Sequence, residues 1–446
     1  MNSGLILALF LSFSLYDPVF LKDYSIEFLE LRKSFINLGS DTYVWTFADT
    51  SEERPFIKFS PSLKLINITK DRVNYTNSYI DLAFDAGVRF DHFQVYAKVN
   101  FFNFLAPYKF KFYEPLADNR YNLYSFDEQP IVGGTSLFDI NVEKAYIQYS
   151  KHNFEILVGR NNVMIGEALL FSGLCYPLDH VYRLSFSFSN FKVVSAFAVT
   201  QDTFPEKTVS YQTLEWKPFD NLTVTFYEAV SHTGKDYFKY FNPISLYYER
   251  QRRGTSNSDN LLGGLAVRFD VKNRMSLFFD FLNDDFIVFK GGTSKYGVCA
   301  GLETSLDTYS LLRFSFVAIP RFTYTHVSDT NAWQIMGLPL GYPRGNDLLD
   351  LYLSYLRKLR NGGYFIFRVA QLNKGEGTLK EHWENSGYPK NMPFPTGQVE
   401  RELFAMLGYQ KRSIYVGLFT EWKYSESSNA FGAFIYFKNN VFKLVF

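Results

Sequence analysis

Cysteine is scarce in this chain: Cys175 and Cys299 are the two among 446 residues. A fold built on disulfides needs more cysteines at regular spacing, so the sequence excludes that class. The two cysteines are compatible with either a reducing or an oxidising compartment and do not indicate where the protein resides.

Net charge, long apolar runs and cofactor motifs are also lacking. The net charge of +1 creates no global field that would favour nucleic acid, so no nucleic-acid partner is expected. Nothing after the N-terminus approaches the roughly 20 consecutive apolar residues of a membrane helix. No P-loop, GxGxxG, GxSxG or zinc-spacing motif occurs, and the six histidines are scattered. We therefore expect no cofactor and no metal site.

Aromatic residues are abundant instead. They make up 19% of the chain, with 48 Phe and 32 Tyr, which is far too many for a disordered chain. A soluble core would struggle to bury them all. Charged residues still make up 20%, which excludes a bundle of membrane helices.

The N-terminus predicts export. Residues 1–14 have the shape of a secretory signal peptide, because Leu5 to Leu11 form a short apolar run before small residues, although no Lys or Arg precedes it. A buried N-terminal helix is the alternative. Residues 15–55 are expected to form a short periplasmic helical segment. Its apolar stripe has helical spacing and consists of Tyr24, Phe28, Leu31, Phe35 and Leu38.

From residue 56 to residue 446 the apolar period is two. In QVYAKVNF, for example, Val95 and Val99 alternate with Tyr96 and Lys98. Counting such segments gives about 18 strands of about ten residues each, separated by turn residues. No linker, composition shift or fixed repeat divides them, so 56–446 is expected to be one β domain.

Two architectures produce this alternation: a soluble sandwich and a transmembrane antiparallel β-barrel. The strand lengths match a tilted crossing of a membrane. Aromatic residues crowd the expected strand ends, as membrane-interface girdles require; examples are Tyr324, Trp422 and Tyr424. The polar faces carry full charges, at Lys98, Arg268, Asp280, Arg313, Arg321 and Arg368. We therefore favour an all-β outer-membrane barrel with outer-membrane lipid as its surroundings.

The C-terminus strengthens this interpretation. Phe442, Leu444 and Phe446 alternate to the last residue, an ending that resembles the signal bacterial outer-membrane proteins present to their barrel-assembly machinery. The sidedness of the loops stays open. If Phe446 is periplasmic and Asn439–Asn440 forms a hairpin, the long segments would fall on the periplasmic side, where loops are normally short.

Two stretches resemble a known family. The first runs from FNPISLYYERQRRG through DNLLGGLAVRFDV to SLFFDFLNDDF, and the second is FTYTHVSDTNAWQIMGLPLGYPRGNDLLDLYL. Together they resemble the capsule assembly Wzi-like family of outer-membrane proteins. The strand GRNNVMIGEALLFSG also resembles the family's Gly-Arg strand, although it lacks the Trp-Gly-Pro-Gly that often follows.

The resemblance implies an outer-membrane barrel of a two-membrane bacterium with a small periplasmic helical part. It also implies a role in capturing or organising capsular or extracellular polysaccharide at the cell surface. The family-motif positions in this sequence are expected to be structural. They are Asn242, Pro243, Asp285, His326, Pro339 and Gly341.

Arg250, Arg252 and Arg253 form one candidate site for an acidic polysaccharide, because guanidinium groups grip carboxylates bidentately. The alternative is a loop or lumen wall in which these arginines pair with local acids such as Glu249.

Trp333, Tyr342 and Arg344 form a second candidate, because aromatic faces beside an arginine suit sugar rings. The alternative is that this segment folds into the barrel and plugs it, with Trp333 serving for packing. The sequence leaves both interpretations open.

Catalysis is not expected. Asp284 and Asp285 are adjacent in an expected strand and so point to opposite faces. His326 and Ser328 share a face, and such a pair could activate a hydroxyl, but no third member is evident. We expect a non-enzymatic polysaccharide-binding barrel, with a porin or substrate-specific channel on the same fold as the alternative.

Overall fold

The structure of the chain is a computed structural model. It describes the following residues: 55–70, 73–105, 139–161, 163–166, 170–172, 178–200, 207–233, 240–241, 246–249, 259–271, 274–284, 295–335, 338–342, 344–381, 393–411, 414–424, 428–438 and 442–445. The expected signal peptide and periplasmic helix lie outside them.

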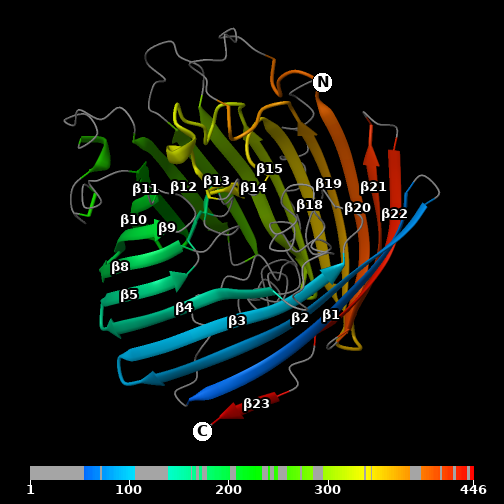
Figure 1. Ribbon diagram of the computed structural model, residues 1–446, viewed down its shortest axis with the longest axis horizontal. Helices are drawn as coiled ribbons and strands as arrows, with labels where there is room; N and C mark the ends of the chain where they lie inside the picture. Colours follow the sequence, from blue (N-terminus) through cyan, green and yellow to red (C-terminus); the bar gives the residue numbers. More distant parts are fainter. Residues whose placement is uncertain are drawn as a thin grey trace.

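One large antiparallel sheet contains most of the described chain (Figure 1). Its strands are β1 (Phe56–Lys70), β2 (Val73–Phe90), β3 (Phe93–Leu105), β4 (Asp139–Lys151), β5 (Phe154–Asn161), β8 (Leu178–Phe188), β9 (Phe191–Thr200), β10 (Lys207–Phe219), β11 (Leu222–Thr233), β12 (Asn260–Val271), β13 (Met275–Asp284), β14 (Tyr296–Asp307), β15 (Ser310–Ile319), β18 (Leu348–Lys358), β19 (Tyr364–Lys374), β20 (Glu400–Lys411), β21 (Ile414–Lys423), β22 (Ser428–Lys438) and β23 (Phe442–Val445).

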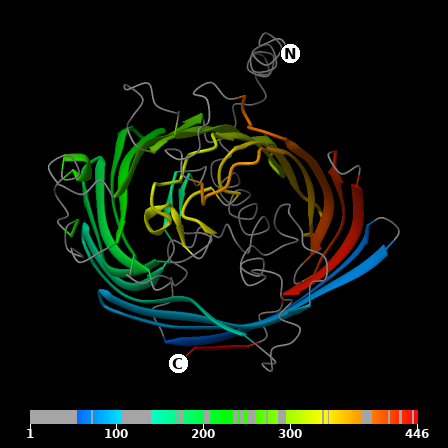
Figure 2. The same ribbon diagram turned by 45° about the horizontal axis from the view of Figure 1, so that its top comes forward.

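The strand pairing runs in a ring. From β1 to β22 each strand pairs with its successor in this order, and β22 pairs with β1, where Ser62 lies opposite Lys438. β23 also pairs with β1, along its first residues, with Phe59 opposite Phe442. Leaving β23 aside, 18 antiparallel strands enclose the interior seen in Figure 2. The expected fold class and strand number are confirmed.

The register of β22 and β23 settles the sidedness of the loops, which the sequence left open. Both strands run antiparallel to β1, so the chain keeps one direction through them and does not reverse as a hairpin at Asn439–Asn440 would require. All connections longer than five residues therefore lie at one end of the barrel. The connections at the other end are short, from two residues (91–92) to five (359–363). We call these the loop end and the turn end.

The strands alternate between an apolar outer face and a mixed inner face. In β13, Leu277 and Phe279 are exposed outward, whereas Phe278 and Asp280 are buried inward. Aromatic rings form a band close to the turn end. Phe90 and Phe93 have centroids 5.7 Å apart, and Phe191 stacks on Trp216 at 6.2 Å. An apolar exterior with interfacial aromatics is what a lipid bilayer selects.

Two of the three aromatic residues expected at strand ends are exposed there: Trp422, near the loop end of β21, and Tyr424, just beyond it. The expectation for Tyr324 was wrong. It lies in a connection between strands and is fully buried. No helix in the described ranges is long and apolar enough to cross a membrane.

Candidate functional site: the plug at the loop end

The connection between β15 and β18, residues 320–347, folds into the barrel interior, where Figure 2 shows it within the ring of strands. We call it the plug. It contains a short 3-10 turn, η3 (Asp329–Asn331), and a two-stranded hairpin of β16 (Gln334–Ile335) and β17 (Leu338–Pro339). Trp333 and Ile335 are fully buried and belong to the main apolar cluster. The plug therefore packs like a core segment.

Local sequence explains why this segment leaves the sheet. Pro320 follows β15 directly and lacks the N–H that a continuing strand needs. Tyr324 and Asp347 adopt positive φ angles of 72° and 53°, which no regular strand contains. Gly341 packs so closely that a Cβ atom there would lie 2.6 Å from the Tyr324 ring. Glycine is thus required at this family-motif position by packing.

Charged side chains of the barrel wall hold the plug. Lys207 of β10 donates from Nζ to the backbone oxygens of Ala332 and Gln334, the latter at 2.6 Å. Asp284 of β13 accepts the backbone N–H of Tyr324 at 2.7 Å. Asp350 of β18 accepts the hydroxyl of Tyr342 at 2.8 Å. Buried charge-assisted bonds of this kind are strong, so the plug is fixed to three separate strands.

A second segment enters the interior from the connection between β5 and β8. It forms a small hairpin of β6 (Met164–Ile165) and β7 (Phe171–Ser172). Phe171 meets Trp333 edge-to-face at 5.5 Å, and Tyr324 donates its hydroxyl to the Leu170 oxygen at 2.6 Å. Burial raises the pKa of Tyr324, so its hydroxyl stays protonated and able to donate.

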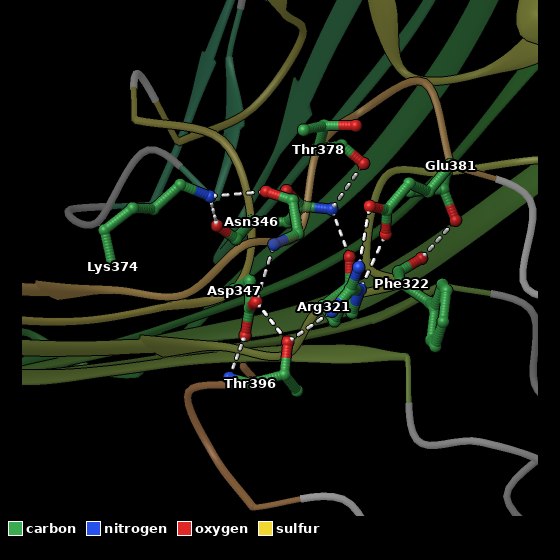
Figure 3. A network of polar contacts seen from close by, with 10 residues as sticks. Arg321, Phe322, Asn346, Asp347, Lys374, Thr378, Glu381 and Thr396 are labelled. Carbon is green, nitrogen blue, oxygen red and sulfur yellow. Dashed lines mark hydrogen bonds and ion pairs between the residues drawn. The ribbon is translucent and has the colours of Figure 1, made fainter. Parts of the chain in front are cut away.

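A third segment, within residues 375–399, joins the plug through the polar network in Figure 3. Arg321 donates to both oxygens of Glu381, at 2.6 and 2.7 Å, and to the Thr396 hydroxyl at 2.9 Å. Asp347 accepts the N–H groups of Gly377 at 2.8 Å and Thr396 at 2.9 Å, and the Thr396 hydroxyl at 2.5 Å.

Lys374, the last residue of β19, completes this network from the wall. Its Nζ donates to the backbone oxygens of Asn346 and of Gly377, the latter at 2.8 Å. The network therefore ties both ends of the plug, near Arg321 and near Asp347, to one neighbouring loop. We call it the latch.

The second candidate group of the sequence lies in the plug. Trp333 is fully buried and Tyr342 nearly so, whereas Arg344 is half-buried. This placement fits the packing alternative for Trp333, whose faces are covered. Pro339 is also buried within the plug.

His326 and Ser328 were expected to share a face of a strand, and that expectation was wrong, because neither residue lies in a strand. Residues 322–328 form turns inside the barrel, and His326 is buried. Its Nδ1 accepts the backbone N–H of Ser328 at 3.2 Å, while the Ser328 hydroxyl bonds Thr330 at 2.6 Å. The Ser328 hydroxyl thus pairs with a threonine. Among the residues that the structure describes, no group of three His, Cys, Asp or Glu is arranged to hold a metal ion.

The remaining sequence candidates are not placed. Arg250, Arg252, Arg253, Asn242, Pro243, Asp285 and Phe446 lie outside the described residues. The backbone of Phe442 and Leu444 belongs to β23, which pairs with β1. Their proposed roles stay predictions.

The inner wall formed by β3 and β4 carries matched pairs of polar residues. Opposite each other on the two strands lie Gln94 and Gln148, Tyr96 and Tyr146, and Lys98 and Lys144. We call these three pairs the inner ladder. The tyrosine rings lie 5.5 Å apart, and the Gln94 amide donates to the Tyr146 hydroxyl at 3.3 Å. Tyrosine faces, amides and ammonium groups are the chemistry that binds sugar rings, hydroxyls and carboxylates.

Sequence reasoning missed the residues that hold the plug. Lys207 and Asp284 contact it from 125 and 40 residues away along the chain. Arg321 was expected merely as one of several charges on a polar face. The Pro and Gly residues of 337–345 indicate an irregular segment, but they do not indicate which wall residues bind it.

Comparisons with known proteins give no match in sequence and clear matches in structure. No protein family and no curated protein matches the sequence. Escherichia coli Wzi, described as an outer-membrane, carbohydrate-binding β-barrel involved in group 1 capsule assembly, superposes with a TM-score of 0.53 at 11% identity, over 87% of this chain and 85% of Wzi.

Two further barrels are similar. Acinetobacter baumannii OccAB4 gives a TM-score of 0.50 at 9% identity and covers 89% of this chain and 100% of its own. The outer membrane protein OprD of Pseudomonas aeruginosa gives a TM-score of 0.45 at 10% identity. The match covers 90% of this chain and 96% of OprD. At these identities the likeness concerns the fold. The chain therefore has the fold of a bacterial outer-membrane β-barrel, which is the fold and location that its sequence predicts.

Proposed function

We propose that this barrel binds or organises polysaccharide at the cell surface and catalyses no reaction. The observation that carries the proposal is the plug. It is held by β10, β13 and β18 and latched to a second inward loop. A barrel that anchors a polymer can be filled by its own loops, whereas a porin needs a wet path through its lumen.

The orientation supports a role at the surface. Outer-membrane barrels place short turns in the periplasm and long loops outside. With this rule the loop end, including the plug, faces the exterior, and β23 ends at the periplasmic face. The connection between β11 and β12, to which Arg250, Arg252 and Arg253 belong in sequence, begins and ends at the loop end. That end would present Phe442, Leu444 and Phe446 to the assembly machinery.

The choice of a polysaccharide ligand rests on the kinds of side chain available. The arginine segment, with Arg250, Arg252 and Arg253, is suited to carboxylates. Wzi, which shares the fold, is described as carbohydrate-binding. We infer that an acidic polymer is the preferred ligand.

The double variant Arg252→Ala/Arg253→Ala is expected to weaken retention on a column of acidic surface polysaccharide by about tenfold or more, because each charge-assisted hydrogen bond contributes about 1.5–3 kcal/mol. The measurement is the dissociation constant of the purified barrel for that polysaccharide. Arg357→Ala/Arg360→Ala removes the same charge at the turn end and should leave binding unchanged. An equal loss of affinity in both double variants would mean that only net charge matters. It would contradict a binding site at Arg252 and Arg253.

A substrate-specific channel is the second candidate. The observation in its favour is the set of charged side chains on the inner wall toward the turn end, where Arg313 pairs with Glu303 at 2.5 Å and Arg268 with Asp270 at 2.9 Å. Such groups can guide a small charged solute. Conductance separates the two candidates, as described in the Discussion.

A further inference from the structure

Part of the connection between β11 and β12 lies outside the barrel. Figure 2 shows its short helix, residues 247–249, beyond the outer surface of the strands. Tyr182 donates its hydroxyl to the Phe241 oxygen at 2.6 Å. Tyr240 donates to the Asp259 carboxylate at 2.8 Å. We call the described residues 240–241 and 246–249 the flap.

The flap covers polar groups on the outer face of the wall. On β11 the exposed Phe226 points outward, so Glu228, two residues nearer the loop end, points outward too. A bare carboxylate on a lipid-facing position is destabilising. Here Glu228 accepts the backbone N–H of Tyr247 at 2.8 Å and the side-chain amide of Gln212.

An apolar cluster fixes the flap to the same strands. Tyr240 and Tyr247 are fully buried against Val230 of β11 and Leu261 of β12. The two tyrosine rings meet edge-to-face at 5.5 Å. The change from exposed apolar to covered polar residues along β11 marks the edge of the hydrocarbon layer on this wall. The flap therefore sits beyond that edge, on the loop-end side.

The outer surface of the flap exposes two apolar side chains and one amphipathic side chain. Leu246 is 61% exposed, Tyr248 46% and Phe241 38%. This surface continues the lipid-facing band that includes Phe226 and Leu214 on the strands below it. Tyrosine favours the level of the lipid headgroups, where its ring is in apolar surroundings and its hydroxyl in polar ones.

We propose that the flap is a membrane-interface element that inserts Leu246 and Tyr248 at the headgroup level of the outer leaflet. Its partner is lipid. The flap covers Glu228 and Gln212 at the edge of the hydrocarbon layer and presents Leu246 and Tyr248 to lipid in their place. This role requires the outer-membrane fold and is independent of polysaccharide binding.

The test places an environment-sensitive dye on Leu246→Cys, in a background with Cys175→Ala and Cys299→Ala, in phosphatidylcholine bilayers. Heat-modifiable gel mobility first confirms that the barrel is folded. Lipids brominated close to the headgroup should quench this dye several-fold more than a dye on Val327→Cys, an exposed plug position. Lipids brominated deep in the acyl chains should quench it less than a dye on Phe226→Cys.

Either of two results would overturn the proposal. Quenching as weak as at Val327 would place the flap in water, away from lipid. Deep-lipid quenching as strong as at Phe226 would place the flap within the hydrocarbon layer, and it would then not be an element of the headgroup region.

Discussion

Replacing the plug by a short glycine-serine turn is expected to convert a barrel of little or no conductance into one with a large, steady conductance. The last residue of β15, Ile319, already lies opposite the first residue of β18, Leu348. A hairpin-length linker can therefore join the two strands without disturbing the wall. Removal of residues 320–347 takes away the buried cluster around Trp333 and the bonds to Lys207 and Asp284. The measurement is single-channel recording in planar bilayers.

The matched control for this deletion is Val327→Ala, a change at an exposed plug residue. It should leave conductance as in the unchanged protein. If the deletion variant folds, as shown by heat-modifiable mobility, and still conducts no ions, the lumen is filled by other segments. The assignment of the closure to residues 320–347 would then be wrong.

Asp347→Asn is expected to loosen the latch by about 3 kcal/mol, roughly a hundredfold in the population of the open plug. The two carboxylate oxygens of Asp347 accept three hydrogen bonds, from Gly377 and Thr396. Asparagine keeps the shape and tolerates the positive φ of 53°, but its NH₂ group cannot accept. The variant therefore removes one hydrogen-bond acceptor without adding backbone strain. Hydrogen exchange at 322–345 in bilayers measures the effect.

Asp307→Asn serves as the control, because Asp307 also accepts hydrogen bonds, from Tyr309 and Ser310, but lies at an exposed turn of the turn end. Exchange in the plug should not change in this variant. Unchanged exchange in Asp347→Asn itself would mean that the latch does not hold the plug, and that the wall contacts of Lys207 and Asp284 suffice.

The barrel could be predicted from sequence because the membrane imposes a strict rule on each strand. Every crossing must present an apolar side chain at alternate positions, and that pattern is local, as in Leu277 and Phe279. The strand number followed from the same count. Nothing in this rule concerns the loops, so it gave no information on which of them enter the lumen.

The same rule misled at one segment. Phe322, Tyr324 and His326 alternate as they would in a strand, but the alternation here results from side chains packing inside a turn-rich plug. Pro320 and the positive φ of Tyr324 prevent a strand, and the second of these is visible only in the structure. Asn439–Asn440 left loop sidedness open for a related reason, because turn-forming residues lie between two strands that keep one direction.

The polar contacts of the plug could not be predicted for a different reason. Arg321 binds Glu381 across 60 residues, and Lys207 reaches the plug across 125. No spacing rule links such residues, because their proximity depends on which strands face each other across the lumen. Buried charges with distant partners are visible only once the ring of strands is in place.

The most direct test of a plugged, polymer-binding barrel is single-channel conductance of the unmodified protein in planar bilayers, with and without acidic surface polysaccharide from the source cells. Closed bilayers in both conditions, together with retention of the protein on immobilised polysaccharide, are the predicted result. A large, steady conductance that the polysaccharide leaves unchanged would contradict the account and identify the protein as an open channel.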